Sequence, residues 1–120
     1  MSYTLKFYEK QAGDCQVRDY LRSQDKKVRG DAGWLLTRLE SEGDKLERPT
    51  TDFLEDGIYE LRIKVKRNQH RILYFFHKTT IVATNAFLKK SGKVPRAEIK
   101  KAKMARADWL EREKQKEKNK

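Results

Sequence analysis

The sequence predicts a single α+β domain in which one strand, a helical hairpin, a three-stranded antiparallel meander and a last helix follow one another. The main observation is the stretch YELRIKVKRNQHRILYFF, residues 59–76, where apolar and polar residues alternate on both sides of a short polar break. Such a period of two is typical of strands that pack one face on a core. Apolar residues at helical spacing before and after this stretch, and a length of 120 residues, complete the prediction.

The N-terminal half is expected to supply the first strand and the helical hairpin. Residues 4–8 form the strand, and Asp14 is the expected N-cap of a first helix that carries Val17, Tyr20 and Leu21. After a break at Gly30-Asp31, a second helix ends at Gly43 and has an apolar stripe of Trp34, Leu35, Leu36 and Leu39. We expect the polar stretch 44–57 to be a loop.

The meander is expected at residues 58–66, 70–77 and 80–87, with short turns between the strands. In the first of these strands one face is apolar, and the other carries Glu60, Arg62, Lys64 and Lys66. Pro95 suits the first turn of the last helix. Residues 113–120 contain no apolar side chain and are expected to fray in solution.

The net charge of +11 is unevenly distributed along the chain. Residues 1–57 carry 10 basic and 12 acidic side chains, residues 58–78 carry 6 and 1, and residues 89–120 carry 13 and 5. A surplus confined to the second half predicts a polyanionic partner, above all nucleic acid. An acidic membrane is the weaker alternative, because no basic helix has a strong apolar face.

The sequence also predicts the cellular compartment of the protein and whether it needs a cofactor. No apolar run is long enough for a signal peptide or a transmembrane segment, and the single cysteine, Cys15, cannot form an internal disulfide. We therefore expect a cytoplasmic protein with no membrane partner. The two histidines, His70 and His77, lack metal-ligand spacing, and no glycine-rich phosphate loop occurs, so we expect neither a metal nor a cofactor.

The residues that remain for chemistry are a dense set of cations: Arg62, Lys64, Lys66, Arg71, Lys89, Lys90 and Lys93. On composition alone this set predicts a binding surface without activity, since basic strands usually hold phosphate. The neighbouring aromatic residues Tyr59 and Phe87 suit either a core or the stacking of an unpaired base.

Four linked motifs narrow these alternatives. The chain contains Gly57-x-Tyr59-Glu60-Leu61-Arg62, then Arg71-x-Leu73-Tyr74, then Phe87-x-Lys89-Lys90, and finally Pro95 followed by Glu98-Ile99. In this order and spacing, residues 57–102 resemble the HigB-like, phage-derived branch of the RelE/ParE toxin superfamily. Residues 1–56 match that branch only as a pattern of a strand followed by a helical hairpin.

The resemblance implies a RelE-like toxin of a type II toxin–antitoxin system, an endoribonuclease that cuts messenger RNA in the ribosome. The RNA's own 2′-hydroxyl would attack the adjacent phosphate, and fixed cations would stabilise the transition state without a metal. We expect Arg71 at the scissile phosphate, Arg62 at a neighbouring one and Lys89 or Lys90 on the leaving side, all on one exposed, concave sheet face. RNA-binding roles fall to Lys64, Lys66, Arg67, Lys90 and Lys93, and Phe87 is expected to stack a base.

The sequence leaves two candidates for the residue that transfers the proton. His77 is a candidate for proton transfer, and a lysine among the other cations is the alternative. The resemblance implies a cognate antitoxin, a HigA-like helix-turn-helix protein, besides the ribosome and its message. Two other functions compete with RNA cleavage. One is a ParE-like poison of DNA gyrase, and the other is a basic nucleic-acid-binding module without catalysis.

Overall fold

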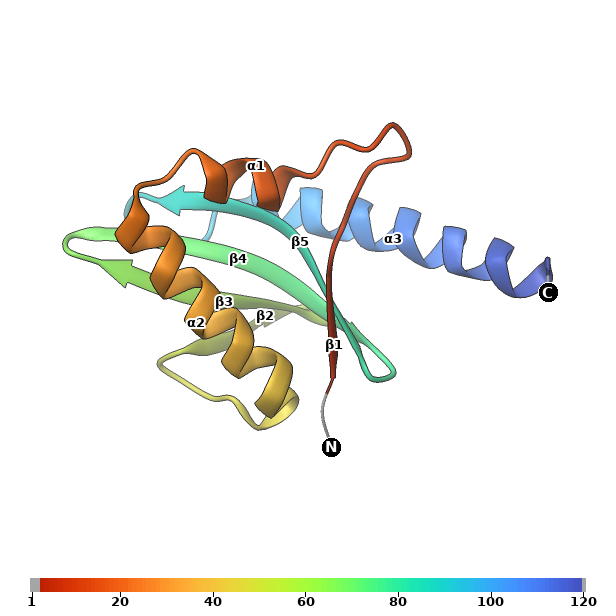
Figure 1. Cartoon of the computed structure of the whole chain (residues 1–120), viewed down its shortest axis with the longest axis horizontal. Helices are drawn as coiled ribbons and strands as arrows, with labels where there is room; N and C mark the ends of the chain where they lie inside the picture. The colour runs from red at the N-terminus through yellow and green to blue at the C-terminus, as the bar shows by residue number, and fades with distance from the viewer. Residues whose placement is uncertain (1–2, 120) are drawn as a thin grey trace.

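The computed structural model describes residues 3–119 and confirms the α+β class. Its elements are β1 (Thr4–Phe7), α1 (Gln16–Arg22), α2 (Lys26–Glu42), a short 3₁₀ helix (Gly43–Lys45), β2 (Thr51–Glu55), β3 (Ile58–Val65), β4 (Asn68–His77), β5 (Thr80–Lys89) and α3 (Arg96–Lys118). The five strands form one sheet in the order β1-β5-β4-β3-β2 (Figure 1). β1 runs parallel to β5, and the other pairs are antiparallel.

The predicted meander is present, but it has a fourth strand that the sequence did not indicate. β2 lies inside the stretch expected to be a loop, and it pairs with β3 from Thr51 opposite Leu61 to Glu55 opposite Ile58. Its sequence TDFLE has no clean alternation, so the strand exists through its hydrogen bonds to β3. β2 consequently forms one edge of the sheet.

The helical hairpin also differs from the prediction in its boundaries. α1 follows Cys15, and not Asp14, as its N-cap. α2 begins at Lys26, where the Asp25 side chain accepts a hydrogen bond from the Val28 amide, and continues through Gly30, where a break was expected. The predicted end at Gly43 is confirmed. α3 is helical to Lys118, so the fraying expected for residues 113–120 stays a prediction about the protein in solution, and residue 120 lies outside the described residues.

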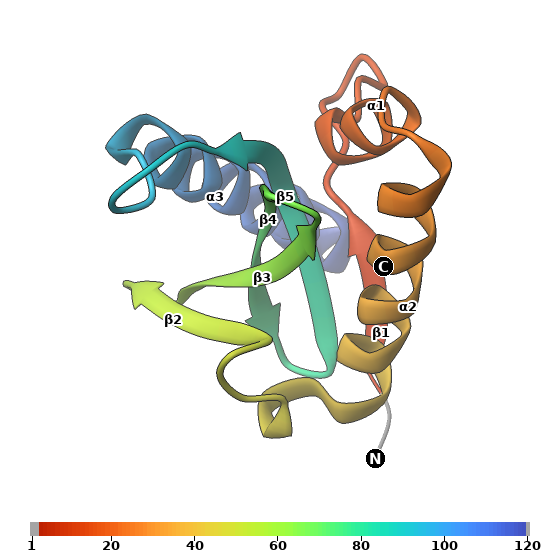
Figure 2. The ribbon, with the colours of Figure 1, turned by 90° about the vertical axis from the view of Figure 1, so that its left-hand side faces the viewer.

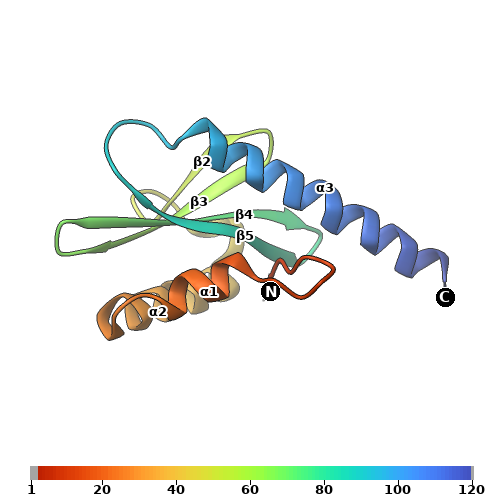
Figure 3. The same ribbon diagram turned by 90° about the horizontal axis from the view of Figure 1, so that it is seen from above.

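The helices cover both faces of the sheet and create two cores. α1 and α2 lie on one face and α3 on the other (Figures 2 and 3). The first core joins α1 and α2 to inward-facing residues of β3, β4 and β5, among them Leu61, Ile63, Ile72 and Ile81. The second joins α3 to Ile58, Leu73, Phe75, Val82 and Phe87. Trp34, expected in the apolar stripe of α2, is instead 65% exposed on its outer side.

A side chain completes the sheet at its β1 edge. β1 pairs with β5 only from Thr80 to Ala83. Beyond that point Gln16 takes over: its side-chain amide donates to the Ala86 carbonyl oxygen over 2.7 Å and accepts from the Ala86 amide over 2.6 Å. The Gln16 amide thus satisfies the two backbone groups that a neighbouring strand would bind.

None of the helices in the described part of the chain is both long enough and apolar enough to cross a membrane.

Two glycines, Gly30 inside α2 and Gly43 at its C-cap, offer a matched stability test. Gly43 has φ +56°, and a Cβ added there would overlap the Tyr3 ring, whereas a Cβ at Gly30 would meet nothing within 4 Å. We expect Gly43→Ala to lower the free energy of unfolding by about 1–3 kcal/mol, because it adds both backbone strain and a steric clash. Gly30→Ala should raise it by about 0.5–1 kcal/mol. Chemical denaturation of both variants measures the difference, and equal effects would contradict it.

Candidate functional site

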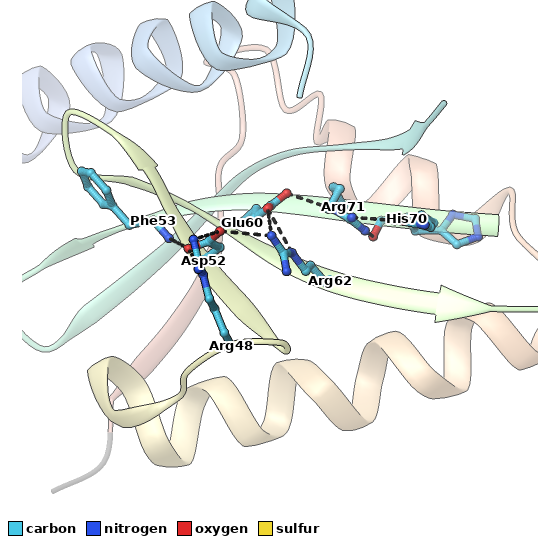
Figure 4. A network of polar contacts seen from close by, with 8 residues as sticks. Arg48, Asp52, Phe53, Glu60, Arg62, His70 and Arg71 are labelled. Atoms are coloured by element: carbon cyan, nitrogen blue, oxygen red, sulfur yellow. Dashed lines mark hydrogen bonds and ion pairs between the residues drawn. The ribbon is translucent and has the colours of Figure 1, made fainter. Parts of the chain in front are cut away.

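The pairing of β3 with β4 places two arginines directly opposite each other. Arg62 faces Arg71 in the register, on the side of the sheet that α3 covers. Glu60, two residues before Arg62, lies between them: its Oε1 is 2.8 Å from Arg71 Nε, and its Oε2 is 3.0 Å from Arg62 Nη2 (Figure 4). The Nε–H of Arg71 does not point at Glu60 Oε1, so these two groups form an ion pair without a hydrogen bond. One carboxylate therefore holds both guanidiniums.

A second carboxylate extends the network to the edge strand. Asp52 Oδ2 lies 3.1 Å from Arg62 Nη2, and both oxygens of Asp52 accept hydrogen bonds from Arg48 over 2.9 and 3.0 Å. The Arg48 guanidinium lowers the pKa of Asp52 from its ordinary value. Charges thus alternate from Arg48 at the edge of the sheet, through Asp52, Arg62 and Glu60, to Arg71.

Arg71 is buried, which corrects the expectation that it lies on an exposed face. Only 5% of the residue is accessible. Its guanidinium donates to the Gln69 side chain over 2.7 Å and to the His70 carbonyl oxygen over 3.2 Å. Burial lowers the pKa of Arg71, while the charge of Glu60 raises it. Arg71 is therefore fixed in direction, and Arg62, whose side chain is 32% exposed, is the more accessible of the two.

The two arginines line a pocket of about 490 Å³ together with Lys89 and Lys93. Its other wall is the segment before α3 and the start of that helix. Glu55 of β2 closes this side, because it forms ion pairs with Arg96 and Lys103 of α3. Arg96, which has the larger effect, and Lys103 lower the pKa of Glu55 to about 2. The structure thus brings together three predicted catalytic residues and one predicted RNA-binding lysine.

The other predicted site residues lie outside this pocket. Lys64, Lys66 and Arg67 are exposed on β3 and on the turn to β4, at the same end of the sheet as the pocket, and Lys90 is exposed after β5. Phe87 is buried in the core under α3 and is not free to stack a base. Tyr59 is also a packing residue, with its ring stacked on Tyr74 at 5.5 Å.

His77, the candidate proton carrier, lies far from the arginines. It is six residues beyond Arg71 on β4, about 20 Å away at the usual rise of a strand. There its ring packs edge-on against Trp109 of α3 at 5.3 Å. Within residues 3–119 no three His, Cys, Asp or Glu side chains are grouped so that they could hold a metal ion.

The two carboxylates that organise the site were not among the site residues predicted from the sequence. Glu60 had a detectable signal, since it is the one acidic side chain among the charged residues of 58–78. A lone carboxylate on a basic strand face is expected to pair with its neighbours. Asp52 had no such signal, because it lies in a segment that was expected to be a loop.

Comparisons with known proteins give the family. The family model described as "Phage derived protein Gp49-like (DUF891)" matches residues 19–107, well over half of the chain. The chain belongs to this family. A solved structure of a double arginine-to-alanine mutant of the Escherichia coli toxin RelE in the free state resembles this Gp49-like protein with a TM-score of 0.49 and 15% identity, over 72% of this chain and 82% of that one. No curated protein matches the sequence.

The burial of Arg71 predicts an asymmetry between the two arginines. Arg71→Ala leaves Glu60 buried with one partner fewer, and we expect it to lower the free energy of unfolding by about 3 kcal/mol. Arg62→Ala should cost about 1 kcal/mol, because its partly exposed ion pairs are weaker. The double variant E60Q/R71M removes both charges and should be more stable than Arg71→Ala. Urea denaturation tests this order, and a harmless Arg71→Ala would contradict it.

Proposed function

We propose that this Gp49-like protein is the toxin of a type II toxin–antitoxin system and a ribosome-dependent mRNA endoribonuclease of HigB type. The observation that supports this most is the convergence of Arg62, Arg71, Lys89 and Lys93 on one pocket. Two of these cations are oriented by a buried carboxylate before any substrate arrives. Fixed cations aimed at one point are what a phosphoryl transition state requires.

The proposed reaction uses the RNA's own 2′-hydroxyl as the nucleophile. The 2′-oxygen forms a bond to the adjacent phosphorus and releases its proton to solvent water, and the bond from phosphorus to the 5′-oxygen of the next nucleotide breaks. Arg71 binds the scissile phosphate, and Arg62, which reaches solvent, binds a neighbouring one. Because Glu60, Gln69 and the His70 carbonyl oxygen already orient Arg71, the reaction needs little reorganisation of that side chain.

We assign the proton for the leaving 5′-oxygen to Lys89. It lines the pocket beside the arginines, whereas Lys90 does not and His77 lies at the far end of β4. An ammonium can donate a proton to an alkoxide as it forms. With no histidine in the pocket, the enzyme depends on the ribosome to hold the message in line for attack.

The proposed partners follow from the same charges. Ribosomal RNA and the message meet the basic end of the sheet, where Lys64, Lys66, Arg67 and Lys90 are exposed. A cognate antitoxin, which we propose to be a HigA-like helix-turn-helix protein, inhibits the toxin in the cytoplasm.

The chemistry of the RNA ends tests the proposed function. Messages cleaved on programmed ribosomes should give upstream fragments with 2′,3′-cyclic or 3′-phosphate ends and downstream fragments with 5′-hydroxyl ends. Cleavage should persist after divalent metals are removed, under conditions that keep the ribosome assembled, because the cations stabilise the charge. Fragments with 5′-phosphates would exclude this mechanism. Intact messages combined with a DNA damage response would favour the gyrase alternative.

A second experiment asks whether Arg62 acts on the substrate. Arg62→Ala should reduce cleavage on the order of a hundredfold, the usual cost of one transition-state contact, and should relieve growth arrest in induced bacteria. Arg22→Ala is the matched control, since it removes an exposed arginine at the end of α1, away from the pocket. A folded Arg62→Ala protein with full toxicity would remove Arg62 from the site.

A further inference from the structure

The outer face of α2 carries a large aromatic side chain that the fold does not cover. Trp34 is the central residue of this helix and is 65% exposed. Gly30 and Gly33, which precede it on the same helix, are also exposed, and a Cβ added at either would meet nothing within 4 Å. A second helix can therefore approach this surface closely. One exposed ring does not by itself indicate a partner, since single apolar side chains are common on protein surfaces.

Four charged side chains flank Trp34 in a regular row. Lys27 and Asp31 precede it, and they form an ion pair over 3.0 Å. Arg38 and Glu42 follow it, and Arg38 Nε lies 2.9 Å from Glu42 Oε2. At 3.6 residues per turn, these four residues and Trp34 lie within about a quarter of the helix circumference. Along this side the helix thus presents a positive, a negative, an aromatic, a positive and a negative side chain.

The order of these charges is complementary to its own reverse. Positions 27 and 42 are equally far from the midpoint between residues 34 and 35, and so are positions 31 and 38. If a second α2 lies antiparallel on the first about this midpoint, Lys27 of each copy is opposite Glu42 of the other. Asp31 of each copy is likewise opposite Arg38 of the other. In a parallel arrangement each charge would face its like, so the row favours the antiparallel pair alone.

We propose that α2 is the interface of a symmetric homodimer, in which two copies of this chain pack their α2 helices antiparallel about Trp34. The two Trp34 rings meet at the two-fold axis, where Gly30 and Gly33 leave room for them. The four charged positions of each helix pair around this aromatic centre. A two-fold interface uses the same patch on both subunits, and an aromatic centre with a charged rim is typical of protein interfaces. The proposal does not depend on RNA cleavage.

The charges favour a second copy over other partners. Two of the four side chains are positive and two are negative, so the row offers no net attraction to a polyanion. A partner of uniform charge would be attracted at only half of the positions, whereas a second copy is complementary at all four. α2 and α3 cover opposite faces of the sheet (Figures 2 and 3). The dimer therefore leaves both cationic pockets, which lie on the α3 side, open to their substrate.

The size of α2 limits the strength of the dimer. A helix of 17 residues is about 25 Å long. One such helix from each copy buries less than the roughly 1,200 Å² of total surface at which stable interfaces begin. We therefore expect a weak dimer whose population rises with protein concentration. Because the charged pairs lie at a solvent-exposed rim, added salt should weaken it further.

Sedimentation velocity tests the dimer. From about 10 μM to 1 mM, a range suited to weak association, the wild type should shift from the monomer toward the dimer. Trp34→Ala should raise the dissociation constant by on the order of tenfold or more, because a central aromatic residue carries much of the energy of an interface. Met104→Ala is the matched control. It removes another exposed apolar side chain, 63% accessible on α3, and should leave the dissociation constant unchanged.

A charge exchange tests the antiparallel register. Lys27→Glu with Arg38→Glu makes the row wholly acidic, and Asp31→Lys with Glu42→Lys makes it wholly basic. Each double variant alone should be monomeric, because like charges face each other, and an equimolar mixture should form the heterodimer. The acidic variant has a net charge four units below the native +11 and the basic variant four units above it. Both remain positive, so overall attraction between the two proteins cannot produce the mixed dimer.

Several results would overturn the proposal. They are a wild type that stays monomeric at the highest concentration, a Trp34→Ala protein that dimerises like the wild type, and an equimolar mixture that stays monomeric. A charge variant that dimerises alone would also overturn it, since the interface would then lie elsewhere on the molecule. Thermal melts confirm that each variant is folded. Cleavage on ribosomes is measured separately, so failure of the dimer leaves the proposed function to its own test.

Discussion

Two positive charges face each other across neighbouring strands, and a buried carboxylate makes that arrangement stable. Arg62 and Arg71 are directly opposite in the register of β3 and β4, where like charges ordinarily repel. Arg71 is also almost fully buried, which is costly for an unpaired guanidinium. Glu60 resolves both difficulties because it contacts the two arginines at once. The direction of both side chains, and so the shape of the cationic pocket, depends on this carboxylate.

The same electrostatic logic explains why β2 matters. Asp52 gives Arg62 a second anionic partner, and it can do so only because β2 pairs with β3 along the edge of the sheet. Glu55 of the same short strand reaches the other way, to Arg96 and Lys103 of α3. A five-residue strand thus joins the arginine network to the helix that walls the pocket. Its sequence lacks the alternation typical of a strand, because Asp52 and Glu55 form these ion pairs.

Sequence periodicity predicted the features that depend on neighbours along the chain. The alternation in residues 58–77 revealed the meander and its basic face, and the four linked motifs indicated the phage-derived family. Features set by contacts between distant segments were missed or misplaced. The burial of Arg71 depends on Glu60 in the adjacent strand, and that of Phe87 depends on α3 packing over β5. Trp34 fitted a helical stripe, but the packing of α2 leaves it outside.

The side-chain amide of Gln16 affects the risk of aggregation while this sheet folds. On the side that faces β1, the second half of β5 has no neighbouring strand, and such an open edge invites pairing with another chain and aggregation. Gln16 blocks it with a single side chain at Ala86, but the two residues are 70 positions apart in sequence. The edge is therefore protected only after the N-terminal segment has docked on the last strand to be synthesised. A chain that folds its meander first passes through a state in which β5 is a template for its neighbours.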